Sequence, residues 1–241
     1  MKFFDLDSPL MQFLSKMADL LWLNILTIIC CIPIFTIGPA LTALHYMALK
    51  MVRNEECYIT RGYFKSFKEN FKQATLIWLL LLFVAAVLGG DFYIMRNTGM
   101  EFPKFLQLII TAVCVLVVFT ATFVFPVLAR FENTIFRTLK NAFIMSILQF
   151  PKTILMLILG IVAPVALFIF VPQAAPIVFA FGFSLPAFVS AMLYNKFFKK
   201  LEDQMEAASS GTEEGEQTPE EDERIFKDEL DETLIDRNDQ K

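Results

Sequence analysis

Long uncharged stretches separated by clusters of Lys and Arg constrain this chain more than any other feature. The stretches cover residues 20–49, 73–90, 105–129 and 153–195. A bilayer core of about 30 Å needs roughly 20 helical residues at about 1.5 Å each, so the first and last stretches are long enough for two crossings. The sequence therefore predicts an all-α fold, a polytopic membrane helix bundle of five to six transmembrane helices. Its 56% hydrophobic content and 27 Phe agree, because one soluble core could not bury them.

The number of crossings depends on residues 39–53. The Gly38-Pro39 pair interrupts the first stretch, since proline lacks a backbone donor and restricts the residue before it. The segment that follows is short for a crossing, and a re-entrant or interfacial helix is the alternative. With six spans, 15 Lys and Arg residues lie on the cytoplasmic side and two on the outer side. With five spans, 13 lie on the cytoplasmic side and four on the outer side. We favour six spans with both termini inside. Either number predicts a multi-pass plasma-membrane protein with a cytoplasmic C-terminus.

The C-terminal end has a different composition. Residues 202–241 hold 16 of the 25 acids and 4 of the 21 bases, which leaves 17 bases against 9 acids in the rest. We therefore divide the chain into a transmembrane helical domain, residues 1–200, and an acidic cytoplasmic tail, residues 201–241. The tail is expected to be mostly flexible, with a short helix over 219–236. The apolar residues Phe226, Leu230 and Leu234 recur every four positions there, as either a docking stripe or part of a solvated tail.

Two short segments resemble each other. Residues 64–71 align with 136–143 at an offset of 72, with apolar residues and cations in the same places. Each predicts a cationic amphipathic helix on the cytoplasmic face, and copies facing the same side make the internal repeat parallel. Chance similarity between two interfacial helices is the alternative. The candidate contacts for anionic headgroups, or for a protein partner, are Lys65, Lys68, Lys72, Arg137 and Lys140.

Recognisable catalytic chemistry is missing from the sequence. His45 is the only histidine, and the sequence has no phosphate-binding loop, nucleophile motif or metal-ligand spacing. We therefore expect no catalytic residue, no cofactor, no metal and no enzyme activity. No nucleic-acid partner is expected either, because the bases already serve membrane orientation.

Candidate polar or hinge positions inside the membrane remain: Asn24, Gly38, Pro39 and His45. For Asn24 and His45, hydrogen bonding to a neighbouring helix is the simpler interpretation, and ligand contact is the other.

The first third of the chain carries a family resemblance. It contains Leu-Trp-Leu-Asn at 21–24, Cys-Ile-Pro-Ile-Phe-Thr-Ile-Gly-Pro-Ala at 31–40 and Ser-Phe-Lys-Glu-Asn-Phe-Lys-Gln-Ala at 66–74. These residues resemble the YesL-like family of bacterial integral membrane proteins. The resemblance implies a small multi-pass protein, mainly of Gram-positive bacteria, encoded near carbohydrate-uptake and polysaccharide-degradation genes. The family has no established activity, so no catalytic residue carries over.

Two functions remain open at this point. The first is an accessory or regulatory component associated with carbohydrate uptake, which binds a transporter through its cytoplasmic helices and tail. The alternative is a stand-alone small-solute transporter, for which the parallel repeat and the interrupted first hairpin argue. The expected partners are membrane lipids through their anionic headgroups, together with a sugar-transporter permease or a second copy of the chain.

Overall fold

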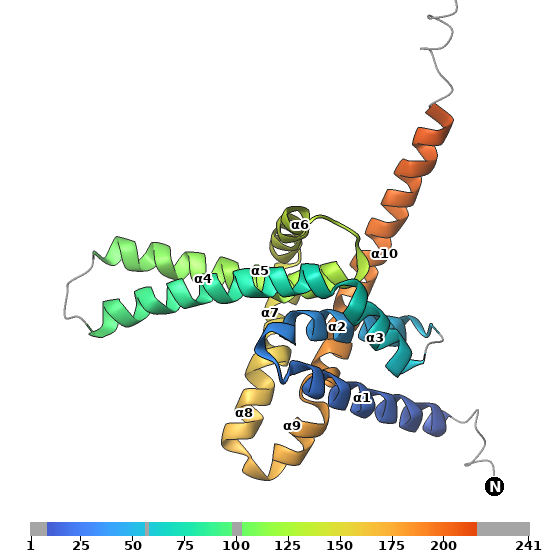
Figure 1. The fold of residues 1–241 in the computed structure, drawn as a ribbon, viewed down its shortest axis with the longest axis horizontal. Helices are drawn as coiled ribbons and strands as arrows, with labels where there is room; N and C mark the ends of the chain where they lie inside the picture. The colour runs from blue at the N-terminus through green and yellow to red at the C-terminus, as the bar shows by residue number, and fades with distance from the viewer. Residues whose placement is uncertain (1–8, 56–57, 98–102, 216–241) are drawn as a thin grey trace, which may run out of the picture. The chain divides into compact units, whose positions relative to one another are not determined.

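The computed structural model describes residues 9–55, 58–97 and 103–215, and every element in these ranges is a helix. In chain order (Figure 1) they are α1 (Pro9–Cys31), η1 (Ile34–Thr36), α2 (Ile37–Arg53), α3 (Ile59–Glu69), α4 (Phe71–Asn97), α5 (Lys104–Arg130), α6 (Ile135–Leu148), α7 (Phe150–Leu157), η2 (Ile158–Val162), α8 (Ala163–Phe170), η3 (Pro172–Ala174), α9 (Ala175–Phe181) and α10 (Ser184–Gly215). The predicted all-α fold is confirmed.

Four helical segments of the described chain are long and apolar enough to cross a membrane: Leu10–Cys31, Phe71–Asn97, Lys104–Arg130 and Phe150–Phe170. A fifth is present if η3 with α9 and the following α10 count as one span, which bends by 59° at the break. Large apolar side chains point outward along these segments, as in Phe83, which is 68% exposed. Such a surface needs lipid around it. The predicted multi-pass helix bundle is therefore confirmed, with four candidate crossings, or five if the bent pair is one span.

The sixth crossing that we favoured is not among these spans. The segment in question forms α2, which has 17 residues, ten of them buried. It packs against α1, α3, α4 and α5. A helix enclosed by protein does not need the length of a lipid-facing span, which is why this short segment is stable as the centre of the bundle.

The α1–α2 connection is a tight hairpin. Thr36 in η1 closes the turn, because its hydroxyl reaches the carbonyl oxygens of Cys30 at 2.6 Å and Pro33 at 2.7 Å. At the other end of the hairpin, Lys16 Nζ donates to Asn54 Oδ1 at 2.8 Å. The beginning of α1 and the end of α2 therefore lie at the same end of the hairpin.

The internal repeat is visible in the order of the elements. A short helix, one residue between helices and a long helical segment follow one another twice: α3, Asn70 and α4, then α6, Gln149 and the continuous run of α7, η2 and α8. The backbone N–H of Asn70 donates to Ser66 at 3.1 Å, and that of Gln149 to Met145 at 2.9 Å. Buried positions also correspond, pairing Tyr63, Ser66, Ala74 and Ile77 with Ala142, Met145, Thr153 and Met156.

These pairs give the repeat a different register. Each pair is separated by 79 residues, seven more than the 72 of the sequence alignment. Seven residues are about two helical turns, so residues seven positions apart lie on nearly the same face of a helix. The sequence alignment therefore matched equivalent faces two turns out of register.

The chain divides into two units, residues 1–195 and 196–241, and α10 passes from the first to the second. Residues 201–215 of the tail, which we expected to be mostly flexible, are helical in α10. Phe226, Leu230, Leu234 and the helix predicted over 219–236 lie outside the described residues.

Candidate functional site

A groove between α1 and α3 brings cations and aromatic rings together. It has a volume of about 1200 Å³ and is lined by residues from α1, from α3 and from Tyr58 before α3. Arg61, Lys65 and Lys68 give it three positive charges, spaced four and three residues apart along one face of α3. Asp19 adds one carboxylate, and the side chains of Trp22, Tyr58 and Phe64 supply apolar surface. We call this the α1–α3 groove.

The position of α3 is fixed from its inner side. Tyr63 is fully buried, and its hydroxyl donates to the carbonyl oxygen of Ala40 on α2 at 3.3 Å. Burial raises the pKa of the Tyr63 hydroxyl, so it keeps its proton for this bond. On the groove side, Trp22 Nε1 donates to Thr60 Oγ1 at 2.9 Å. Two helices therefore hold α3 while its cationic face stays open.

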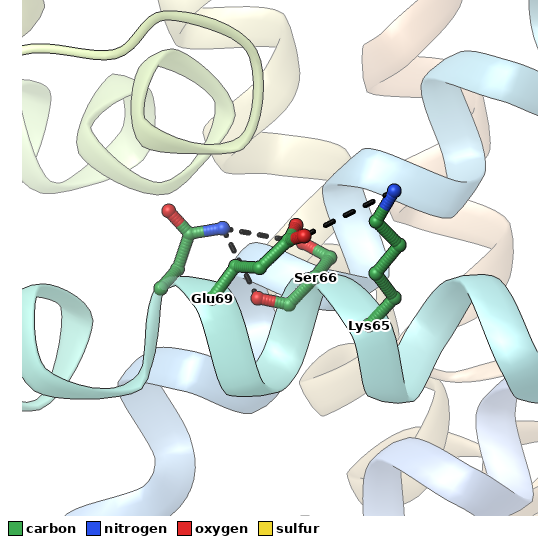
Figure 2. Close-up of polar contacts among 4 residues, drawn as sticks. Lys65, Ser66 and Glu69 are labelled. Atoms are coloured by element: carbon green, nitrogen blue, oxygen red, sulfur yellow. Dashed lines mark hydrogen bonds and ion pairs between the residues drawn. The ribbon is translucent and has the colours of Figure 1, made fainter.

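The lysines of this face are largely available to a ligand. Figure 2 shows Lys65 reaching toward Glu69, one turn along α3, at 3.9 Å between Nζ and Oε1. Both side chains are more than half exposed, and such a pair contributes little. Beside them, Asn70 Nδ2 donates to the Ser66 carbonyl oxygen at 3.0 Å and ends the helix. The ion pair is thus weak enough for an anion to replace Glu69.

The other predicted cations lie elsewhere. Lys72 is exposed in the first turn of α4, and the residues that line the groove do not include it. Arg137 and Lys140 are exposed on α6. The outer side of α6 also carries large apolar side chains, since Phe136 is 79% and Leu148 65% exposed. The structure therefore brings Lys65 and Lys68 together in one groove and leaves the remaining three cations outside it.

A second cleft opens around His45. It has a volume of about 530 Å³ and is lined by α2, α4, α5, the α7–η2 junction and α10. Tyr194 on α10 lies beside His45, with its hydroxyl oxygen 3.4 Å from His45 Nδ1. Nε2 of His45 has no hydrogen-bond partner among the described residues, and a ligand in the cleft can reach it. Aliphatic and aromatic side chains make up most of the rest of the lining.

Ser190 contributes a second polar atom to the His45 cleft. Ser190 lies on α10 one turn before Tyr194, and only 4% of it is exposed. Its hydroxyl, like His45 Nε2, reaches the cleft and bonds to no described residue. The other polar groups of the lining are already used, because Thr122 donates to Val118 at 2.9 Å and Trp78 to Ile34 at 2.8 Å. His45 and Ser190 are thus the polar groups that a ligand would meet.

Asn24 lies outside the cleft and holds two other segments together. It is fully buried on α1. Its Nδ2 donates to the carbonyl oxygen of Phe179 at 2.7 Å, and its Oδ1 accepts from the backbone N–H groups of Phe183 at 2.9 Å and Ser184 at 3.0 Å. These backbone groups flank the break between α9 and α10. Asn24 therefore supplies the hydrogen bonds that the interrupted helix lacks.

Gly38 and Pro39 are packing positions at the start of α2, and both are buried. A Cβ added to Gly38 would clash with the carbonyl oxygen of Ala74 and lie 2.7 Å from Trp78 Cβ. Glycine is therefore required here because α2 and α4 cross in close contact. Pro39 falls in the first turn of α2, where its missing N–H costs no helical hydrogen bond.

Sequence reasoning did not single out five of these residues: Trp22, Tyr58, Arg61, Trp78 and Ser190. A signal existed for Arg61, because it precedes Lys65 by four residues and so continues the same helix face. No comparable signal existed for Ser190, a single hydroxyl in an apolar stretch. Within the described ranges, no three His, Cys, Asp or Glu side chains lie close enough together to hold a metal ion.

Comparison with known proteins finds a family match for part of the chain. Residues 19–92 match a family model described as a protein of unknown function, DUF624. That segment runs from Asp19 on α1 to Phe92 on α4, and so includes most of the α1–α3 groove, Gly38 and His45, but not the second copy of the repeat. No curated protein and no solved structure matches the chain.

Proposed function

We propose that this chain is a multi-pass plasma-membrane protein without catalytic activity of its own, and that it is an accessory or regulatory component associated with carbohydrate uptake. In this proposal the C-terminus is cytoplasmic and the partner is a sugar-transporter permease. The carbohydrate link rests on the YesL-like resemblance, with which the match over residues 19–92 is compatible. The proposal assigns recognition of anionic headgroups, next to the partner, to the α1–α3 groove.

The observation that carries this proposal is the cationic face of α3 inside that groove. Arg61, Lys65 and Lys68 line a groove that also contains the aromatic rings of Trp22, Tyr58 and Phe64. A basic residue near an anionic membrane surface contributes about 1 kcal/mol to binding. Trp and Tyr rings favour the headgroup level of a bilayer. A groove with both features is suited to holding the phosphate of a lipid at the edge of the bundle.

The test compares what co-purifies with the chain from native membranes in mild detergent. The groove variant combines Arg61→Gln, Lys65→Gln and Lys68→Gln. Its control combines Arg96→Gln, at the C-terminal end of α4, with Lys104→Gln, at the N-terminal end of α5. A permease identified by mass spectrometry should accompany the wild type and the control and be depleted from the groove variant. A tail deletion after residue 201 shows whether the tail adds to docking. Recovery of no permease with the wild type would refute the accessory role.

A stand-alone small-solute transporter is the second candidate, and the His45 cleft favours it. The cleft lies beside two helix interruptions, η2 and the α9–α10 break. Interrupted helices at a repeat interface are common around transport sites. Reconstituted liposomes should then show solute flux that is lost in His45→Phe. A permease bound to the chain, together with no flux for any tested solute, would decide for the accessory role.

A further inference from the structure

The lining of the His45 cleft restricts what can bind there. Among its residues, His45 has the only ionisable side chain, and the lining has no Asp, Glu, Lys or Arg. A charged ligand would lose its hydration without gaining a counter-ion, which is costly in apolar surroundings. At about 530 Å³, the cleft falls within the range of roughly 300–1,000 Å³ of small-molecule sites. Size and charge together indicate an uncharged small molecule.

The two polar groups that a ligand would meet lie beside one stretch of α10, which we call the polar end of the cleft. Tyr194, which bonds to His45 Nδ1, lies one turn of α10 beyond Ser190, so both polar groups contact the same stretch of that helix. The rest of the lining is mostly apolar and includes Leu81, Val117 and Ile161. A ligand that fits this arrangement has one hydrogen-bonding end and a long apolar body.

A sugar does not fit this lining. Each hydroxyl of a bound sugar needs a partner, and an unpaired buried hydroxyl costs about 1–3 kcal/mol. His45 and Ser190 can satisfy one or two hydroxyls, while the aliphatic walls satisfy none. We infer that the His45 cleft binds a neutral, lipid-like alcohol, whose hydroxyl bonds to His45 Nε2 and Ser190 Oγ while its hydrocarbon chain lies against α4, α5 and η2.

The chain offers its own reporter for this binding. Its two tryptophans are Trp22 and Trp78, and Trp78 lines the cleft. In a Trp22→Phe background, a long-chain alcohol brominated along its chain should quench Trp78 fluorescence on binding. The matching bromoalkane, which lacks the hydroxyl, is the comparison ligand. The full chain is used in detergent micelles or lipid nanodiscs.

Two glycines provide a matched pair of variants. Gly160 in η2 lines the cleft, and a Cβ added to it meets no atom within 4 Å. Gly160→Leu should therefore fill part of the cleft without a backbone clash. Gly89 on α4 is equally open but does not line the cleft, so Gly89→Leu controls for the added side chain. The polar end is tested by Ser190→Ala.

Saturable quenching by the bromo-alcohol, abolished in Gly160→Leu and retained in Gly89→Leu, is the expected result. The alcohol should bind more tightly than the alkane by about fivefold, the size of one net hydrogen bond, and Ser190→Ala should remove most of this preference. Equal quenching in both glycine variants would mean partition into the surrounding detergent or lipid and would overturn the inference. Equal affinity for alcohol and alkane, or displacement of the alcohol by glucose or maltose, would overturn it as well.

Discussion

The hydroxyl oxygen of Tyr194 lies 3.4 Å from Nδ1 of His45, and this contact orients the imidazole ring between α2 and α10. The two rings are tilted by 55° with their centroids 6.2 Å apart, so they meet at their edges. With Nδ1 engaged, Nε2 is the nitrogen left for the cleft. The pair therefore joins two helices and sets the polar end of the proposed binding site.

Tyr194→Phe should lower stability by about 1 kcal/mol, because it removes the partner of His45 Nδ1 at a nearly fully buried position. The ring itself is kept, so packing hardly changes. Unfolding in mixed detergent, followed by circular dichroism, measures the effect. Tyr93→Phe is the control, since Tyr93 is 69% exposed. Equal stability of the two variants would mean that the Tyr194 contact carries no free energy.

Asn24→Leu should destabilise the bundle by at least about 2 kcal/mol. Leucine keeps the volume but leaves the backbone groups of Phe179, Phe183 and Ser184 without their partner at a buried position. Thermal aggregation of the detergent-solubilised protein measures the loss. Asn97→Leu, at the exposed end of α4, serves as the comparison. An unchanged midpoint in the Asn24 variant would contradict the assigned role.

Gly38→Ala and Gly89→Ala should have opposite effects. At Gly38 the new methyl group meets the α4 backbone, and overpacking of this kind costs about 1–3 kcal/mol. At Gly89 the methyl group meets nothing, so the variant gains only the better helix propensity of alanine, about 1 kcal/mol. Denaturant midpoints of both variants measure the difference. Equal midpoints would mean that α2 and α4 do not touch at this position.

Lys68→Gln should weaken binding of anionic lipid by about fivefold, the equivalent of roughly 1 kcal/mol per base at a membrane surface. The effect should shrink at high salt, because exposed charges are screened. Retention of phosphatidylglycerol by the purified protein, measured by native mass spectrometry, gives the ratio. Lys104→Gln should leave it unchanged, since Lys104 begins α5 and lies outside the groove. An equal loss in both variants would point to net charge rather than to the groove.

Charge and hydropathy predicted the outer helices well, and the reason is physical. Residues 73–90 and 105–129 face lipid along most of their length, so composition alone marks them, and they form the bodies of α4 and α5. For α2, length and hydropathy left a crossing and a re-entrant helix open, because the burial of a helix among other helices cannot be read from its own composition.

The candidate site was less accessible from sequence. Lys65 and Lys68 stand out because their spacing follows a helix face, whereas Trp22 and Tyr58 reach the same groove from distant parts of the chain. The hydrogen-bond partners of buried polar side chains cannot be predicted from sequence either. Nothing in the sequence pairs Asn24 with a backbone more than 150 residues away, because that contact depends on tertiary packing. The position of Asn24 could be predicted, but its partner could not.

The separation between Asn24 and Phe183 has a consequence for biogenesis. A ribosome that delivers α1 to the membrane exposes the Asn24 amide long before the α9–α10 break has been synthesised. During that interval the amide must bond to water, to lipid headgroups or to a temporary protein neighbour. The α9–α10 break thus supplies the partners of an amide on the first helix, so a chain that is cut short after α8 would present an unsatisfied asparagine to membrane quality control.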